Sequence, residues 1–305
     1  PPEYNRKVAN AGGPSEIETL LGDRGFQLIR VEIRTAGDLS QGMDRLKSEG
    51  AECLFAVLSH WTRISLVVNL VRSMELPAAL YARTTSGYNG ITALTAASAG
   101  LREISHTDTT DLHTRFKDGM EPEMLEWVEG VTAWRLMRKS RLMCWGGSYG
   151  ANMPYTRSDP EWLESRLVAE VMTEQEVVLT DIADRILADE SPRLERFVDW
   201  LMDSGLKVEY DERMCTPETV HRQTALYLAA RDRLSELAGE NIHGVSLKCH
   251  FELSTTHWGC TGCLVPAFLP FPEGPEGKQM VIPVACEGDL NGLVSLLMLH
   301  SVNPE

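Results

Sequence analysis

Hydrophobic and polar positions in the first half of the chain form short apolar runs, each followed by a segment with helical spacing. The run from Cys53 to Leu58 predicts a buried strand, and the segment from Ile64 to Met74 predicts a helix. The same patterns predict strands at 26–32 and 77–81, a helix that begins at Asp38 and ends before Gly50, and a helix at 91–99. Repeated strand–helix units of this spacing indicate an α/β fold whose parallel sheet carries helices on both faces.

The second half repeats this organisation after a long helical segment at 122–138. An apolar strand begins at Arg141, and further strands are predicted at 245–251 and 281–285. Helices are predicted at 159–169, 181–188, 192–204 and 217–238, with another from Leu293 and an exposed loop at 270–277. We therefore expect two α/β domains, residues 1–138 and 139–305, bridged by the long helix.

The composition is that of an ordinary globular protein, with 43% hydrophobic and 24% charged residues among 305. A net charge of −15 argues against a surface that binds nucleic acid or an anionic membrane. No apolar run of about 18 residues predicts a transmembrane helix, and no secretory signal is visible. The chain begins Pro-Pro-Glu-Tyr without methionine and ends just after an apolar helix, so we expect material to be missing at one or both ends.

Seven cysteines are scattered along the chain, an odd number that favours a reducing compartment and a cytoplasmic protein. Cys260 and Cys263 form a CxxC motif, flanked by Cys249 and Cys286. A structural zinc site needs a second short pair of ligands, and a redox CxxC opens a helix. Because neither feature is predicted here, we interpret these residues as ordinary buried cysteines.

Two carboxylates, Glu287 and Asp289, follow the strand predicted at 281–285. In α/β proteins the carboxyl ends of strands are where substrates and metals bind, which makes this pair a candidate site. Alternatively, Asp289 caps the following helix and Glu287 is a solvated loop acid. The pattern alone leaves both interpretations open.

Two further segments could carry chemistry. His250 and Glu252 are two residues apart on a predicted strand and would share a face, as a metal-binding or proton-relay pair does. Alternatively, His250 is an interior histidine with satisfied hydrogen bonds. Gly146-Gly-Ser-Tyr-Gly150 follows a strand, as a phosphate-binding loop would, but it lacks both the GxGxxG order and the Gly-Lys-Ser/Thr ending.

Three segments, taken in order, carry a resemblance to a known family. They are Gly146-Gly-Ser-Tyr-Gly with Tyr155-Thr and Asp159-Pro-x-Trp162, then Lys248-Cys-His-Phe-Glu-Leu-Ser, then Ala285-Cys-Glu-Gly-Asp-Leu-Asn-Gly-Leu. The chain resembles the L-fucose isomerase and L-arabinose isomerase superfamily over most of its length, most specifically over 245–299. The resemblance implies two Rossmann-like domains with open parallel sheets, and the family's β-rich C-terminal domain would be missing or truncated. It also implies an active site between the subunits of a homotrimer or homohexamer.

The reaction implied by the resemblance is aldose–ketose isomerisation of a monosaccharide through an ene-diol, with Mn²⁺ or another divalent metal as cofactor. Glu287 matches the glutamate that binds the metal and shuttles the proton. Substrate binding is implied for His250, where fucose isomerases have glutamine, for Tyr149, where they have methionine, and for Trp61, as an aromatic residue that reaches a neighbouring subunit. The other metal ligands, an aspartate and a histidine, are expected beyond Glu305.

The leading hypothesis from the sequence is therefore a metal-dependent sugar isomerase. The alternative is a non-catalytic sugar-binding or assembly protein of the same fold, and a nucleotide-binding α/β protein that uses 146–150 is a third hypothesis. The identity of the sugar stays open, because Arg83, Arg157 and Lys248 are cations that could bind a sulfonated or phosphorylated sugar.

Overall fold

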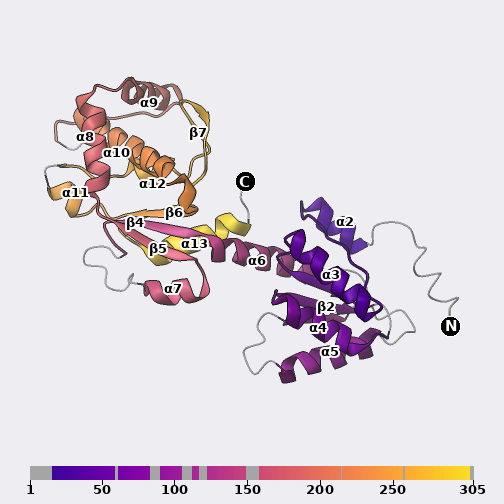
Figure 1. The fold of residues 1–305 in the computed structure, drawn as a ribbon. Coiled ribbons are helices and arrows are strands. Elements are labelled where there is room, and N and C mark those ends of the chain that lie inside the picture. The colour runs from indigo at the N-terminus through magenta and orange to yellow at the C-terminus, as the bar shows by residue number, and fades with distance from the viewer. Residues whose placement is uncertain are drawn as a thin grey trace. The chain divides into compact units, whose positions relative to one another are not determined.

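The computed structural model describes residues 16–58, 61–82, 90–104, 112–116, 122–148, 158–213, 215–256 and 258–302 (Figure 1). The chain divides into two compact units, residues 1–132 and 133–305, which we call the first and the second unit. The division falls inside helix α6 (Pro122–Lys139), ahead of the boundary expected at 138/139. None of the described helices is long and apolar enough to span a membrane.

The first unit contains a three-stranded parallel sheet in the order β1-β2-β3. Its elements are α2 (Glu16–Asp23), α3 (Ala36–Ser48), β1 (Leu54–Val57), α4 (Ile64–Met74), β2 (Ala78–Ala82), α5 (Gly90–Ile104), β3 (Leu112–Phe116) and the first part of α6. The central strand β2 is buried on both faces, because Leu80 packs among α4 and α5 while Tyr81 packs against Leu21 and Val128 of α2 and α6. A strand covered on both faces is typical of parallel sheets.

The strand predicted at 26–32 is not present in the structure. These residues form neither helix nor strand, and within the described ranges they pair with no strand. Val31 and Ile33 instead pack beside α3, next to Gly42. Alternating apolar positions predict one buried side of an extended segment, and here a helix rather than a neighbouring strand covers that side.

The second unit contains a four-stranded parallel sheet in the order β5-β4-β6-β9 and a small antiparallel hairpin, β7-β8. Its strands are β4 (Arg141–Trp145), β5 (Glu170–Glu174), β6 (Ile242–Leu247), β7 (Glu273–Gly274), β8 (Gly277–Lys278) and β9 (Val284–Cys286). Its helices are α7 (Pro160–Arg166), α8 (Val177–Ala188), α9 (Pro192–Asp203), α10 (Pro217–Glu236), the 3₁₀ turn η2 (Ala238–Glu240), α11 (Glu252–Thr255), α12 (Leu264–Phe268) and α13 (Leu290–Val302).

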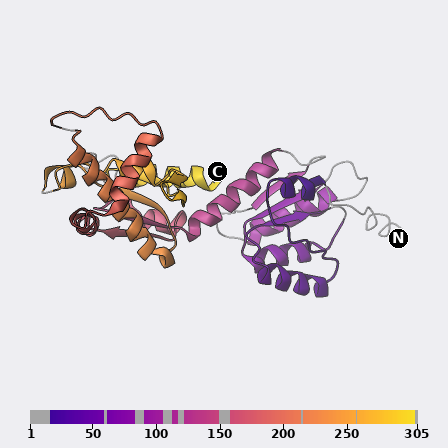
Figure 2. The ribbon, with the colours of Figure 1, turned by 90° about the horizontal axis from the view of Figure 1, so that it is seen from above.

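Helices cover both faces of this second sheet (Figures 1 and 2). Met143 and Trp145 of β4 point into a core formed with α8, α9, α10 and α12. Leu142 and Cys144 alternate with them and point into a core formed with α6, α7 and α13. The prediction of an α/β fold with parallel sheets is therefore confirmed.

The strand order of the second unit reverses direction at β4. The chain leaves β4 toward β5 on one side, whereas β6 lies on the other side of β4. Ligands of open α/β sheets bind at the carboxyl ends of the strands where the order reverses in this way. Next to this point, β6 and β9 run parallel, with Leu247 opposite Cys286 at their carboxyl ends.

Several predicted boundaries differ from the structure. The strand predicted at 245–251 ends at Leu247, the loop predicted at 270–277 contains β7, and α8 begins at Val177 rather than at 181. β3 and β5 were not expected, because their sequences, LHTRF and EVMTE, mix polar and apolar residues. β5 stands at the end of the strand order, and a strand in that position can keep polar side chains in solvent.

Candidate functional site

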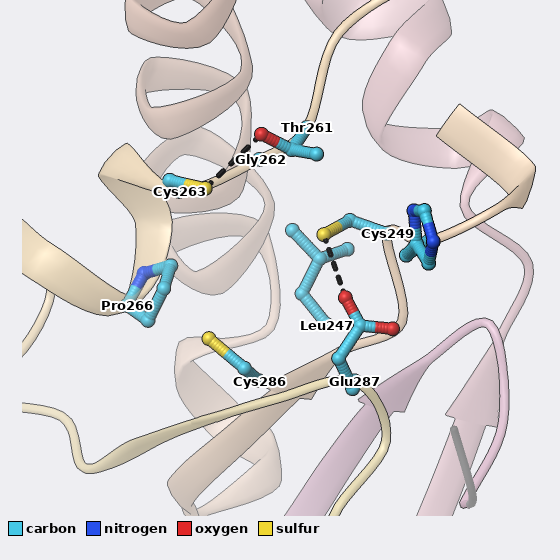
Figure 3. A pocket seen from close by; sticks show the side chains of 9 residues that line it. Leu247, Cys249, Thr261, Gly262, Cys263, Pro266, Cys286 and Glu287 are labelled. Carbon is cyan, nitrogen blue, oxygen red and sulfur yellow. Dashed lines mark hydrogen bonds between the residues drawn. The ribbon is translucent and has the colours of Figure 1, made fainter. Parts of the chain in front are cut away.

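A cavity of about 290 Å³ opens at the carboxyl ends of β6 and β9 (Figure 3). Its walls come from the turn after β6, the loop before α12 and the turn after β9. The lining residues are Leu247, Cys249, His250, Thr261, Gly262, Cys263, Pro266, Cys286 and Glu287. Pockets for small molecules typically measure about 300–1,000 Å³, so this cavity suits one small ligand.

Glu287 occupies the first position after β9 and directs its carboxylate into the cavity (Figure 3). Its backbone N–H donates to the carbonyl of Leu247 at 2.8 Å and so extends the pairing of β6 with β9 by one residue. Its φ angle of 60° is left-handed, a conformation that is rare outside glycine and concentrates at functional sites. Asp289, two residues later, accepts a hydrogen bond from the N–H of Gly292 at 2.8 Å and thus caps α13. Helix capping is the alternative role that the sequence predicts for Asp289.

The thiol of Cys249 contacts the carboxylate of Glu287. The Sγ donates a hydrogen bond to Oε1 of Glu287 at 3.1 Å. Burial, with a smaller contribution from the nearby carboxylate, raises the pKa of Cys249 to about 12. The thiol therefore stays protonated at neutral pH and remains a hydrogen-bond donor.

Three of the nine described lining residues are cysteines, which the sequence predicts to be ordinary buried residues. None of the seven cysteines forms a disulfide. The prediction of burial is confirmed for Cys249 and Cys260 and is wrong for Cys263 and Cys286, which are exposed. The expectation that the CxxC does not open a helix is wrong, because Cys263 immediately precedes α12. Burial raises the pKa of Cys260 to about 11.

His250 lines the cavity, but not in the geometry that the sequence predicted. It lies in the turn after β6, is exposed rather than interior, and its Nδ1 is 3.2 Å from Oγ of Ser254. Glu252 begins α11 and forms an ion pair with Lys248 at 2.6 Å. The predicted His250–Glu252 pair on one strand face is therefore wrong, because the strand ends before both residues.

Of the two remaining predicted substrate-binding residues, Trp61 is described and does not line this cavity. Trp61 lies in the first unit, just before α4, with 55% of its surface exposed. Tyr149 lies outside the described residues, as do Arg83 and Arg157. Of the cations considered for a charged sugar, Lys248 is described, and its charge is compensated by Glu252.

The cavity residues that sequence analysis missed come from turns that are far apart in the chain. Cys249, Cys263 and Cys286 meet because β6, α12 and β9 are neighbours in the fold. The CxxC and the cysteines that flank it were a visible signal of this cluster. They lie close to Glu287 because of the order of the strands in the sheet, and the sequence pattern does not predict that order.

A manganese ion would need more ligands than this cavity offers. Mn²⁺ prefers several oxygen or imidazole ligands, and Glu287 is one carboxylate next to a protonated thiol. Within the described residues, no group of three or more His, Cys, Asp or Glu side chains is placed to hold a metal ion. These described residues do not form a complete Mn²⁺ site.

No protein-family model matches the chain, and a search of curated proteins finds no match.

Proposed function

We propose that the protein is an aldose–ketose isomerase that acts on a free monosaccharide through an ene-diol, with Glu287 as the group that moves the proton. The observation that carries this proposal is the carboxylate of Glu287 in the wall of a small cavity, at the carboxyl end of a parallel strand. Carboxylates at such positions serve as acid–base groups toward small ligands. The resemblance of 245–299 to sugar isomerases supports the same function.

The reaction needs one base that works at two neighbouring carbons. Glu287 would remove the proton from C2 of the open-chain aldose, and the electron pair would pass to the carbonyl and form an ene-diolate. The proton on O2 would move to O1, and the carboxyl group would return its proton to C1. The product is the ketose with the same atoms, and the carboxylate is regenerated.

The walls of the cavity favour an uncharged sugar. Among the described residues that line it, none is a lysine or an arginine, and a phosphate or sulfonate group is normally bound by such cations. Leu247 and Pro266 offer apolar surface, while Thr261 and His250 can exchange hydrogen bonds with hydroxyl groups.

The proposal also covers a divalent metal cofactor, the oligomeric state of the protein and the fold of its two units. Mn²⁺ or a similar ion would stabilise charge on the sugar oxygens when bound, with Glu287 as one ligand and the others from outside the described residues or from another subunit. We further propose that both units are Rossmann-like, that the protein is cytoplasmic, and that it assembles as a homotrimer or homohexamer in which Trp61 would serve a neighbouring subunit. Light scattering would test the assembly.

The test is an assay of the full chain against a panel of aldoses, with and without Mn²⁺. We expect turnover of at least one free aldose, and we expect Glu287→Gln to lower kcat by about 10²–10⁴-fold, as the loss of an acid–base group does. Glu209→Gln, an exposed acid in a loop, is the control for the loss of one charge. Wild-type turnover by Glu287→Gln would contradict the proposal, and calorimetric sugar binding without turnover would favour the non-catalytic alternative.

A further inference from the structure

We infer that Cys249 is a positioning residue for Glu287, whose thiol holds the carboxylate in the orientation that proton transfer needs. The inference rests on the proposed role of Glu287 and adds a second functional residue to the same cavity.

The contact itself is direct and partly buried. Sγ of Cys249 lies 3.1 Å from Oε1 of Glu287, and Figure 3 shows the two side chains pointing toward each other. The thiol is the donor and the carboxylate oxygen the acceptor. Cys249 is 6% exposed, and a hydrogen bond removed from water is electrostatically stronger than an exposed one.

Backbone hydrogen bonds fix both ends of this contact. The carbonyl of Cys249 accepts from the N–H of Leu253 at 3.0 Å and from that of Ser254 at 3.3 Å, which ties the turn after β6 to α11. The N–H of Glu287 donates to the carbonyl of Leu247 at 2.8 Å. Because both backbones are anchored, the thiol stands at a defined place relative to the glutamate.

The consequence concerns the side chain of Glu287. A glutamate has three rotatable bonds and populates several rotamers when nothing holds it. The thiol occupies Oε1, which leaves Oε2 as the oxygen that exchanges the proton with the substrate. Loss of the donor should therefore reduce the fraction of carboxylates in the reactive orientation, an effect on kcat rather than on sugar binding.

Two substitutions at position 249 and one elsewhere separate positioning from packing. Cys249→Ala removes the donor, Cys249→Ser keeps a donor of similar size, and Cys144→Ala removes a buried thiol that lies on β4 outside the cavity. We expect Cys249→Ala to lower kcat about 10- to 100-fold, the usual range for one hydrogen bond to a charged group, with little change in KM. Cys249→Ser should regain most of that loss, and Cys144→Ala should keep the wild-type kcat.

A vibrational measurement tests the contact without relying on activity. The S–H stretching band of Cys249, assigned by its loss in Cys249→Ser, should shift to higher frequency in Glu287→Ala, where the acceptor is gone. An unshifted band would overturn the inference, as would a folded Cys249→Ala with wild-type kcat, or a Cys249→Ser as impaired as Cys249→Ala. If the wild-type chain isomerises no aldose, the proposed function fails, whereas the S–H band still decides whether this thiol donates to Glu287.

Discussion

Glu176 is a carboxylate in an unfavourable environment. Its Oε1 is buried without a hydrogen-bond partner, in the space that a Cβ at position 146 would occupy if Gly146 were replaced. Burial raises the pKa of Glu176, and the negative charge of Glu252 adds to the rise while Lys248 opposes it. The folded state thus prefers the protonated acid, so the free energy of unfolding falls as the pH rises through the raised pKa.

We therefore expect Glu176→Gln to stabilise the protein at neutral pH. The amide removes the buried charge, and the gain should stay below about 1 kcal/mol because solvent screens a half-exposed group. Urea unfolding between roughly pH 4 and pH 8 should show the difference between variant and wild type shrinking toward low pH, where the wild-type acid is also neutral. Glu209→Gln is the exposed control, and a Glu176→Gln that is less stable than wild type at pH 7 would contradict this account.

The backbone of Glu287 adopts a strained left-handed conformation, which its proposed catalytic role would explain. A left-handed conformation costs a residue with a Cβ about 1–2 kcal/mol, and glycine avoids this cost. Glu287→Gly should consequently be more stable than Glu287→Ala by about 1 kcal/mol, although both lose the carboxylate. Chemical denaturation of the two variants makes the comparison, and equal stabilities would show that the turn after β9 is not strained.

The N-terminus of α13 depends on one side chain. Oδ1 of Asp289 accepts from the N–H of Gly292, and a Cβ at position 292 would lie 2.6 Å from Oδ2 of Asp289, so the glycine leaves room for the cap. Loss of an N-cap typically costs about 1 kcal/mol. We expect Asp289→Ala to lower the free energy of unfolding by about that amount and Asp289→Asn to lower it much less, as measured in urea. If the alanine variant were as stable as wild type, the cap would contribute nothing.

Helices and strands with strong local patterns could be predicted from the sequence, but the contacts between them could not. The helix predicted from Ile64 to Met74 has those bounds in the structure, because its apolar residues repeat with helical spacing. The alternation at 26–32 predicted a strand equally well, but which partner covers an extended segment depends on the rest of the fold. For the site, the position of Glu287 after a strand could be read from the sequence. The contact of Cys249 with Glu287 requires β6 to lie next to β9, a choice of neighbours that no local pattern encodes.

At the scale of the whole molecule, the two units have separate hydrophobic cores. Leu80 is buried among α4 and α5 of the first unit, and Phe197 is buried among helices of the second. The described residues that line the cavity all belong to the second unit. Helix α6 crosses the division, with Val128 in a core of the first unit and Met137 in a core of the second.

Separate cores predict that the chain does not unfold in one step. Domains with their own cores can unfold as separate cooperative units, so calorimetry or urea titration should show two transitions. Leu80→Ala should destabilise the first unit by about 2–5 kcal/mol and Phe197→Ala the second by about 3–5 kcal/mol, each shifting one transition while the other moves little. Activity, or sugar binding where turnover is absent, should disappear with the transition that Phe197→Ala shifts, because that unit contains the cavity. A single transition that moves with both substitutions would instead show that α6 couples the two cores into one cooperative unit.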